Sequence, residues 1–163
     1  MIHQVNIDYM MKKDDVSSVS VDIVNAAELD EMWSFVRCKS NQRWLWLAIE
    51  HETGEVLAYT FGRREDIVFL RLSKLLKPLG IDRFYSDNWS SYVKYLDSDK
   101  HTIGKANTQR IERKNLTFRT HIKRLTRKTI CFSKSVAMHD IVVGLVINFW
   151  EFPMFHFSLK QHL

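Results

Sequence analysis

The order in which strand and helix patterns follow one another most constrains the fold of this chain. Three strand patterns come first, and helical and strand patterns then alternate along the rest of the regular sequence. Strands are predicted over residues 23–37, 43–49, 56–61, 83–86 and 101–103, and helices over 64–77, 90–97, 108–125 and about 135–150. This order predicts an α/β fold with a mixed five-stranded sheet and flanking helices.

Turn-forming residues mark where the predicted elements end, and polar residues interrupt two of the apolar segments. Thr53-Gly54 joins the second and third strands into a hairpin, and Pro78 ends the first helix. The acidic pair Asp30-Glu31 interrupts the otherwise apolar first strand. Asn115 interrupts an apolar stripe on the 108–125 helix, which is otherwise amphipathic.

Length and composition indicate one globular domain. At 163 residues with 45% hydrophobic side chains, the chain can bury one core, which we place at 23–151 between an N-terminal extension or linker at 1–22 and a C-terminal tail at 152–163. Residues 1–22 lack the apolar region of a signal peptide, and no apolar stretch is long enough to span a membrane. Cys38 and Cys131 form no CxxC pair, which argues against a zinc site and fits a reducing cytoplasm.

Positive charge is concentrated in one segment. Residues 105–134 contain ten Lys or Arg and one acid, Glu112, so this segment carries +9 while the whole chain carries +5. A basic segment on an acidic remainder indicates a polyanionic partner, and nucleic acid is the first choice. A solvated helix face without a partner has the same pattern, and charge alone gives both interpretations equal weight. The expected DNA contacts are Arg110, Arg113, Lys114, Arg119, Lys123, Arg124, Arg127 and Lys128.

Three carboxylates fall where the predicted elements can bring them to one edge of the sheet. Asp30 lies in the first strand, Asp87 closes the fourth, and Glu112 begins the basic helix. Carboxylates from separate elements suit Mg2+, and two such ions can stabilise the attacking and the leaving oxygen of phosphoryl transfer. Each acid also has a structural interpretation, with Asp87 as a turn or capping residue and Glu112 as a partner of the helix dipole. Asp30 is harder to explain in this way, because burying an unpaired carboxylate is costly.

The basic helix could continue the acidic site. On a continuous helix, Arg119 and Lys123 lie seven and eleven positions after Glu112 and therefore on its face. Such a row of cations could hold the phosphate backbone that leads into the site. The alternative is mutual charge compensation on the helix surface, worth only ~0.3–0.5 kcal/mol per pair.

Five segments resemble the transposases of the insertion sequence one family and cover roughly residues 25–148. They are AELDEMWSFV, SNQRWLWLAIEHETGEVLAYTFG, FYSDNWSSY, TQRIERKNLTFRTHIKRLTRKTICFSKSV and MHDIVVG. The resemblance implies an RNase H-like fold and a DDE transposase whose catalytic and metal-binding triad is Asp30, Asp87 and Glu112. It also implies two Mg2+ ions, with Mn2+ as a substitute. Arg119 would be the basic residue that many such enzymes carry seven positions after the glutamate.

Four further residues fall within the matching segments. His139 and Asp140 match a His-Asp pair of the family, for which helix packing is the preferred interpretation. Trp33 and Trp89 closely follow the first two acids. They could stack on an unpaired base, but packing in the core or in a wall of the site is preferred.

The predicted function is metal-dependent cleavage of the ends of an insertion element and strand transfer into double-stranded target DNA, by a homo-oligomer on the DNA. Enzymes of this family resemble fusions in which an upstream reading frame supplies zinc-binding and helix-turn-helix segments. This chain resembles the downstream frame, so such a segment is expected as a fusion or a partner, and the sequence after Trp150 diverges from the family pattern. The alternatives are a catalytically inactive DNA-binding or regulatory remnant and a metal-dependent nuclease without strand transfer.

Overall fold

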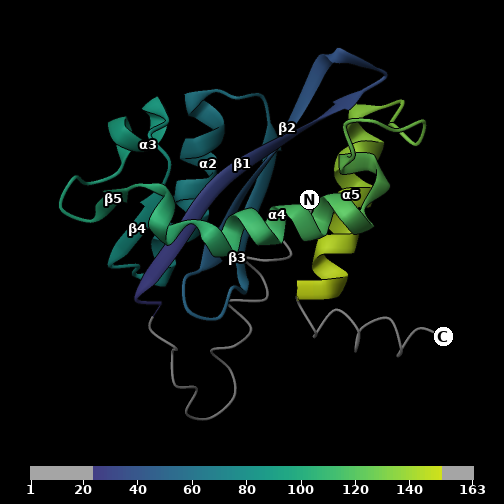
Figure 1. The fold of residues 1–163 in the computed structure, drawn as a ribbon. Helices are drawn as coiled ribbons and strands as arrows, with labels where there is room; N and C mark the ends of the chain where they lie inside the picture. Colours follow the sequence, from purple (N-terminus) through teal and green to yellow (C-terminus); the bar gives the residue numbers. More distant parts are fainter. Residues whose placement is uncertain (1–23, 152–163) are drawn as a thin grey trace.

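A computed structural model describes residues 24–151 as a five-stranded sheet flanked by helices (Figure 1). The strands are β1 (Ala26–Val36), β2 (Cys38–Glu50), β3 (Val56–Gly62), β4 (Arg83–Ser86) and β5 (His101–Ile103). The helices are α2 (Asp66–Leu76), α3 (Ser90–Tyr95), α4 (Gln109–His121) and α5 (Val136–Glu151), with 3-10 turns η2 (Lys77–Leu79), η3 (Lys105–Asn107) and η4 (Lys123–Leu125). The extension predicted at 1–22 and the tail predicted at 152–163 lie outside the described residues.

The sheet is mixed, as the sequence predicts. Its strand order is β3-β2-β1-β4-β5. β1, β2 and β3 pair antiparallel as a meander, whereas β4 pairs parallel with β1 and β5 pairs parallel with β4. The parallel connections run through helices, because a parallel crossover needs a long link between the ends of its strands. The predicted α/β class and five-stranded mixed sheet are confirmed.

Strand β1 runs without a break through the acidic pair that the sequence suggested as an interruption. The two carboxylates have partners, so neither breaks the strand. Asn115 donates a hydrogen bond to Asp30, at 2.7 Å. Glu31 accepts hydrogen bonds from the Arg64 guanidinium and the Tyr92 hydroxyl at 2.8 and 2.7 Å. Tertiary partners thus keep the buried acids in the strand at an acceptable cost.

The hairpin of β1 and β2 is longer than the sequence predicts. β2 begins at Cys38, five residues before the expected start at Arg43, and pairs with β1 up to Val36. Arg37 makes the turn with a φ of 68°, a left-handed conformation that is uncommon for residues other than glycine. The hairpin projects beyond the helices that cover the sheet (Figure 1). The residues near its tip are polar and exposed, which is why the hydrophobic pattern did not include them.

Helix α4 ends earlier than its apolar stripe predicts. The expected helix reaches Leu125, but Ile122 is extended and the chain continues as the short turn η4. Thr126 and Arg119 hold this break, because the Thr126 hydroxyl donates to the Arg119 carbonyl and the Arg119 guanidinium donates to the Leu125 carbonyl. The predicted placement of Lys123 on the helical face of Glu112 is therefore wrong.

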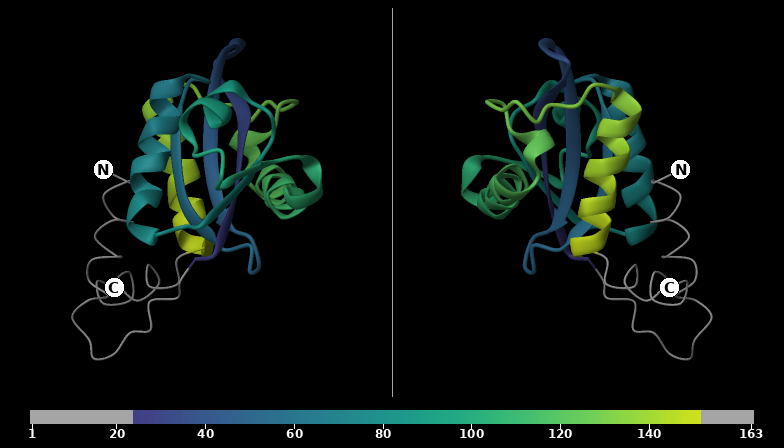
Figure 2. Two further views of the ribbon diagram at one scale, coloured as in Figure 1. Left: turned by 90° about the vertical axis from the view of Figure 1, so that its left-hand side faces the viewer. Right: turned by 90° about the vertical axis from the view of Figure 1, so that its right-hand side faces the viewer.

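The core lies on both faces of the sheet, and β2 contributes to each. Leu45, Leu47 and Ile49 pack with α4 and α5, whereas Trp46 and Ala48 pack with α2 and α3. This alternation follows from the two-residue period of a strand. Figure 2 shows α2 and α4 on opposite sides of the sheet. None of the helices in the described part of the chain is long and apolar enough to cross a membrane.

His139 joins α5 to the sheet. Its ring, 1% exposed, lies 3.1 Å from the hydroxyl of Ser34 on β1 and 2.8 Å from that of Ser133 in the loop before α5. The adjacent Asp140 forms an ion pair with Arg43 of β2. These contacts are structural and agree with the packing role preferred for the His-Asp pair.

Burial of His139 makes the stability of the fold dependent on pH. Burial lowers the pKa of His139 from 6.5 to about 4, so the unfolded chain takes up a proton that the folded chain excludes between these pH values. Stability is therefore lost as the pH falls from 6.5 to 4. Chemical denaturation should show the free-energy gap between wild type and His139→Gln narrowing by about 3 kcal/mol from pH 7 to pH 4. A gap that does not change with pH would contradict this assignment.

Candidate active site

Two of the three predicted acids lie side by side at the junction of two parallel strands. In the β1–β4 ladder, Ala26 pairs with Arg83 and Glu28 pairs with Tyr85, an offset that also relates Asp30 to Asp87. Neighbouring strands lie about 4.8 Å apart, so this register sets the two aspartates level with each other just beyond the last paired residues. The charge of Asp87 acts on Asp30, as expected for close neighbours.

Asp30 is a carboxylate whose charge is poorly compensated. It is mostly buried, and burial together with the charges of Glu31 and Asp87 raises its pKa from 3.8 to about 7. The hydrogen bond from Asn115 acts in the opposite direction but is weaker. The other amide atom of Asn115, Oδ1, is buried and has no hydrogen-bond partner among the described residues.

Asp87 has one oxygen engaged in local structure. Its Oδ1 accepts a hydrogen bond of 3.0 Å from the backbone N–H of Trp89, immediately before α3. This is the turn role that the sequence offered as the structural alternative. The side chain is nevertheless exposed, and one oxygen bond leaves further acceptor capacity on the carboxylate. Its turn role and a role as a metal ligand are therefore compatible.

Helix α4 is attached to β1 by a carboxylate from the strand. Glu28 is 1% exposed, and its Oε2 accepts a hydrogen bond of 2.8 Å from the backbone N–H of Ile111 in the first turn of α4. Its Oε1 lies 2.8 Å from Nδ1 of His51. The bond to Ile111 satisfies one of the amides that a helix leaves free at its N-terminus. Glu28 therefore fixes where α4 begins relative to β1.

Glu112 lies on α4 one turn before Asn115, but its side chain is exposed and does not complete a triad. Side chains three positions apart on a helix are neighbours, and Asn115 contacts Asp30. Within residues 24–151, however, no three His, Cys, Asp or Glu side chains come close enough together to hold a metal ion. The structure thus brings Asp30 and Asp87 together, and Glu112 lies on the helix whose Asn115 contacts Asp30.

The chemistry of the site fits a divalent cation. Asp30 and Asp87 offer hard oxygen donors, which Mg2+ prefers. Burial, the largest cause, and the charges of Glu31 and Asp87 raise the pKa of Asp30, and the hydrogen bonds that Asp30 accepts do not offset them. The unsatisfied Oδ1 of Asn115 adds a neutral oxygen beside them. A cation bound here would offset the cost of burying Asp30.

The basic residues predicted to contact DNA fall into different environments. Lys114 is ion-paired with Glu151 of α5 at 2.9 Å, and the Arg124 guanidinium donates to the Ser133 hydroxyl at 3.0 Å. Both therefore have structural partners. Arg110, Arg113 and Lys123 are exposed and form no ion pair with any described residue. The remaining predicted contacts, Arg119, Arg127 and Lys128, lie around Trp33.

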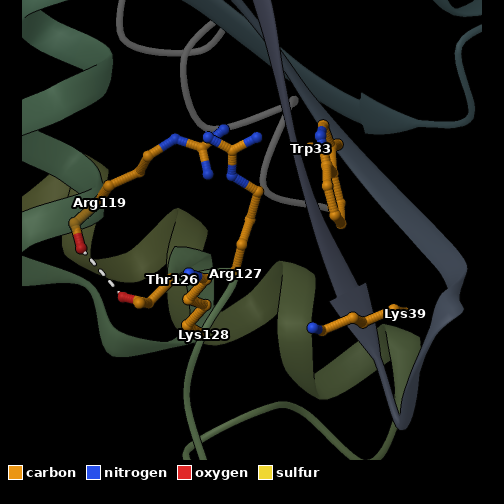
Figure 3. A pocket seen from close by; sticks show the side chains of 6 residues that line it. All are labelled: Trp33, Lys39, Arg119, Thr126, Arg127 and Lys128. Atoms are coloured by element: carbon orange, nitrogen blue, oxygen red, sulfur yellow. Dashed lines mark hydrogen bonds between the residues drawn. The ribbon is translucent and has the colours of Figure 1, made fainter.

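Four further cations surround one indole. A hollow beside β1 is lined by Trp33, Lys39, Arg119, Thr126, Arg127 and Lys128 (Figure 3). The guanidinium of Arg127 lies 5.4 Å from the centroid of the Trp33 ring. The charges of Arg127 and Asp30 both act on Arg119, so this hollow adjoins the acidic site.

The two tryptophans differ in role. Trp89 packs against Trp46 and Tyr92, with ring centroids 4.8 and 5.5 Å apart, and belongs to the wall of the core as preferred from the sequence. Trp33 is half-buried and faces the basic hollow. Of the two preferred interpretations, Trp33 therefore fits packing in a wall and not in the core.

Comparison with known proteins decides the family. Residues 23–153 match the profile of the IS1 transposase family. The chain belongs to this family. It is 57% identical over 121 residues to the insertion element iso-IS1n protein InsB of Shigella dysenteriae, a match covering 74% of this chain and 92% of that protein. It is 43% identical over 127 residues to the insertion element IS1 9 protein InsB of Escherichia coli K12, covering 78% of this chain and 76% of that protein.

Solved structures show the fold of this IS1-family transposase. The catalytic core domain of BIV integrase matches with a TM-score of 0.51 at 14% identity, covering 77% of this chain and 82% of that one. A chain of a simian T-cell lymphotropic virus intasome in complex with PP2A regulatory subunit B56 gamma matches with a TM-score of 0.52 at 15% identity, covering 82% and 51%. Retroviral integrase cores are RNase H-like, so the predicted fold family is confirmed.

Sequence reasoning missed two polar residues that build the site of this transposase. Asn115 was read only as an interruption of an apolar stripe, although a polar residue on a buried helix face needs a partner. Glu28 lies two residues before Asp30 in the apolar first strand and is not among the predicted site residues. Each of these polar residues falls in an apolar segment, which indicates a buried polar side chain with a hydrogen-bond partner. The sequence does not identify that partner.

Removing the carboxylate of Glu28 should loosen α4. Glu28→Ala leaves the Ile111 amide and the His51 ring without their partner, and we expect a loss of about 2–3 kcal/mol in the free energy of unfolding. Glu52→Ala, in the exposed turn of the β2–β3 hairpin, should change it by less than about 0.5 kcal/mol. Denaturant unfolding measures both, and amide exchange at Ile111 should accelerate only in the first variant. Equal stability of the two variants would show that Glu28 does not anchor the helix.

Proposed function

We propose that this IS1-family chain is a DDE transposase that cleaves the ends of an insertion element and transfers the strands into target DNA. The observation that carries this proposal is that Asp30 and Asp87 are close neighbours just beyond the β1–β4 ladder, with Asp30 hydrogen-bonded to the helix that bears Glu112. The integrase-like fold and the family support the same chemistry. The catalytic triad would be Asp30, Asp87 and Glu112.

The acids would hold two Mg2+ ions. Asp30 and Asp87 would hold them, together with Glu112 after a rotation or shift of its exposed side chain. When bound, Mg2+, or Mn2+ in its place, supplies positioning and stabilisation of the charge on the attacking and leaving oxygens. Asn115 would orient Asp30 through their hydrogen bond. The residues are fixed by strands and by α4, as precise positioning of a phosphate requires.

The proposed reaction has two displacements at phosphorus. Water first attacks the phosphodiester at the end of the element, and the bond to the 3′ oxygen breaks, leaving a 3′-hydroxyl. That hydroxyl then attacks a phosphodiester of the target, forming a new 3′–5′ link and releasing a target 3′-hydroxyl. The chain needs no nucleophile of its own. Arg119, on the side of α4 that approaches Asp30, would hold phosphate oxygens near the acids.

The partners follow from the same proposal. The cations of residues 110–128 would grip the DNA backbone without reading its bases, except Lys114 and Arg124, which already have partners. Recognition of the element ends would come from an upstream-frame DNA-binding segment, as a fusion or a partner, and two or more copies would assemble on the DNA. The place of action would be the cytoplasm, where both exposed cysteines can stay reduced.

The competing functions make different products. An inactive DNA-binding or regulatory remnant would use the same cations without the acids, and a nuclease would stop after hydrolysis. The buried, poorly compensated charge of Asp30 favours a working metal site, because a chain that only binds DNA has no use for it.

Divalent metal should stabilise the protein through Asp30. Mn2+ about 100-fold above its Kd is expected to add about 2.7 kcal/mol to the free energy of unfolding, because it binds the folded state and relieves the clustered negative charge. Thermal unfolding should show this gain in wild type and in Asp99→Asn, an exposed acid outside the site. Asp30→Asn should show none. An equal gain in all three proteins would place the metal elsewhere.

Asp87 should be required for joining but not for DNA binding. We expect Asp87→Asn to lower strand transfer from a pre-cut oligonucleotide end into plasmid DNA at least about 100-fold. A residue that only supports a metal ligand would lower the activity by about 10- to 100-fold when it is lost. The assay uses Mn2+, with each protein tested alone and fused to an upstream DNA-binding segment, and Asp99→Asn as the matched control.

Three results of this assay distinguish the candidate functions. Joined product that disappears only in Asp87→Asn supports the transposase. Cleaved DNA without joined product supports the nuclease. No product from any protein, with DNA binding intact, supports the inactive remnant.

A further inference from the structure

The hollow beside Trp33 is built from separate parts of the chain. Its volume is about 480 Å3, within the range of small-ligand sites, and its lining comes from β1, the start of β2, the end of α4 and the segment after η4 (Figure 3). It is lined by one aromatic ring, four cationic side chains and Thr126. None of its lining residues is an acid, so its composition suits an anionic ligand with a flat apolar part.

The hollow lies where the edge of β1 is open. On that side β4 pairs with β1 only as far as Glu28, and the next contact is the bridge from Val36 to Ser133. Among the described strands, none pairs with the edge of β1 between these points. Trp33 lies in this open stretch, three residues beyond Asp30. Arg119, which lines the hollow and on which the charge of Asp30 acts, connects the hollow to the acidic site.

The cations around the hollow lack acidic partners. Arg119, Arg127, Lys39 and Lys128 form no ion pair with any residue of the described chain. The side chains of Arg119 and Arg127 point toward one another in Figure 3, and their like charges disfavour each other. An anion between them would remove this repulsion. Planar guanidinium groups suit a phosphate, to which they can donate paired hydrogen bonds.

The indole of Trp33 offers a stacking surface. The Arg127 guanidinium lies 5.4 Å from the ring centroid, a cation–π contact that shows the ring face is accessible from the hollow. Arg127 donates no side-chain hydrogen bond to the described residues, so it can move onto a phosphate without breaking one. A base has the flat aromatic surface that an indole binds in proteins that hold single-stranded DNA.

We propose that this hollow binds one unpaired nucleotide of the DNA next to the acidic site, with its base stacked on Trp33 and its phosphate between Arg119 and Arg127. The inference rests on the proposed function only in taking DNA as the substrate. It adds a structural requirement, which is that the strand entering the site is unpaired for at least one nucleotide. The hollow would hold that nucleotide apart from its complementary strand.

The test compares DNAs that differ only in whether the single-stranded tail carries bases. Duplexes with a short single-stranded tail, on the 3′ or the 5′ end, are paired with duplexes whose tail has the same phosphates but abasic sugars. Binding is measured by fluorescence anisotropy in EDTA, so metal and catalysis play no part. Wild type should bind one of the tailed duplexes at least about fivefold more tightly than its abasic counterpart, as expected for base–aromatic stacking. Trp33→Ala should bind both equally.

Matched variants separate the roles of the ring and the charges. Trp150→Ala removes another half-exposed indole, on α5, and should keep the preference for the intact tail. Arg127→Met should weaken binding to both kinds of tail and reduce the salt dependence, whereas Arg71→Met, on α2, should not. Trp33→Leu keeps an apolar side chain on the strand and provides the same test if Trp33→Ala does not fold.

These binding measurements test the proposed nucleotide site without depending on catalysis. A folded Trp33→Ala or Trp33→Leu variant that keeps the full preference for the intact tail overturns the inference. So does tight binding of a free deoxynucleoside monophosphate with no preference among the DNAs, which would assign the hollow to a small nucleotide. Loss of the preference in the Trp33 variants supports the inference even if no protein joins DNA strands, a result that would count only against the transposase proposal.

Discussion

The hydrogen bond from the Ile111 amide to the Glu28 carboxylate is the contact on which the rest of the site depends. It joins the first turn of α4 to β1 and fixes where the helix begins relative to the strand, while Ile111 and Phe118 pack the helix on the core. A buried carboxylate is costly, but here it accepts a backbone N–H at a helix N-terminus and pairs with His51, so the cost is offset. Once α4 is fixed, Asn115 meets Asp30 one turn later, and Arg119 approaches the same acid after a further turn.

The second organising feature is the way β1 is shared between its neighbours. Near its start it pairs parallel with β4, which sets Asp87 level with Asp30, and beyond Glu28 its edge becomes free. The acids therefore lie where regular pairing stops and a substrate can approach. Burial raises the pKa of Asp30 to about 7, which means that the folded chain maintains its ionised form at a cost. Such a cost is expected at a functional site, where stability is sacrificed for a charge that a ligand can use.

Local patterns predicted most of the fold because they depend on neighbours in sequence. The hairpin at Thr53-Gly54 and the stop at Pro78 follow from turn and breaker chemistry, and the mixed sheet follows from element order. The site was predictable only in part. Asp30 and Asp87 end up together because of strand register, which no local pattern encodes. The continuity of β1 through Asp30-Glu31 depends on Arg64, Tyr92 and Asn115, which lie far along the chain.

The one clear failure of helical periodicity explains how the basic hollow forms. The apolar stripe continues to Leu125, and both Ile122 and Leu125 are buried in the same core as α4, so periodicity alone predicts a helix to that point. The chain instead leaves the helix at Ile122 while keeping these side chains in the core. On a continued helix, Arg119 and Arg127 would lie two turns apart along the axis. Because the helix breaks, the chain turns back and Arg127 reaches both Arg119 and Trp33. A cluster of charges that looks uniform in sequence is thereby divided into a hollow with a defined lining and a set of scattered surface cations.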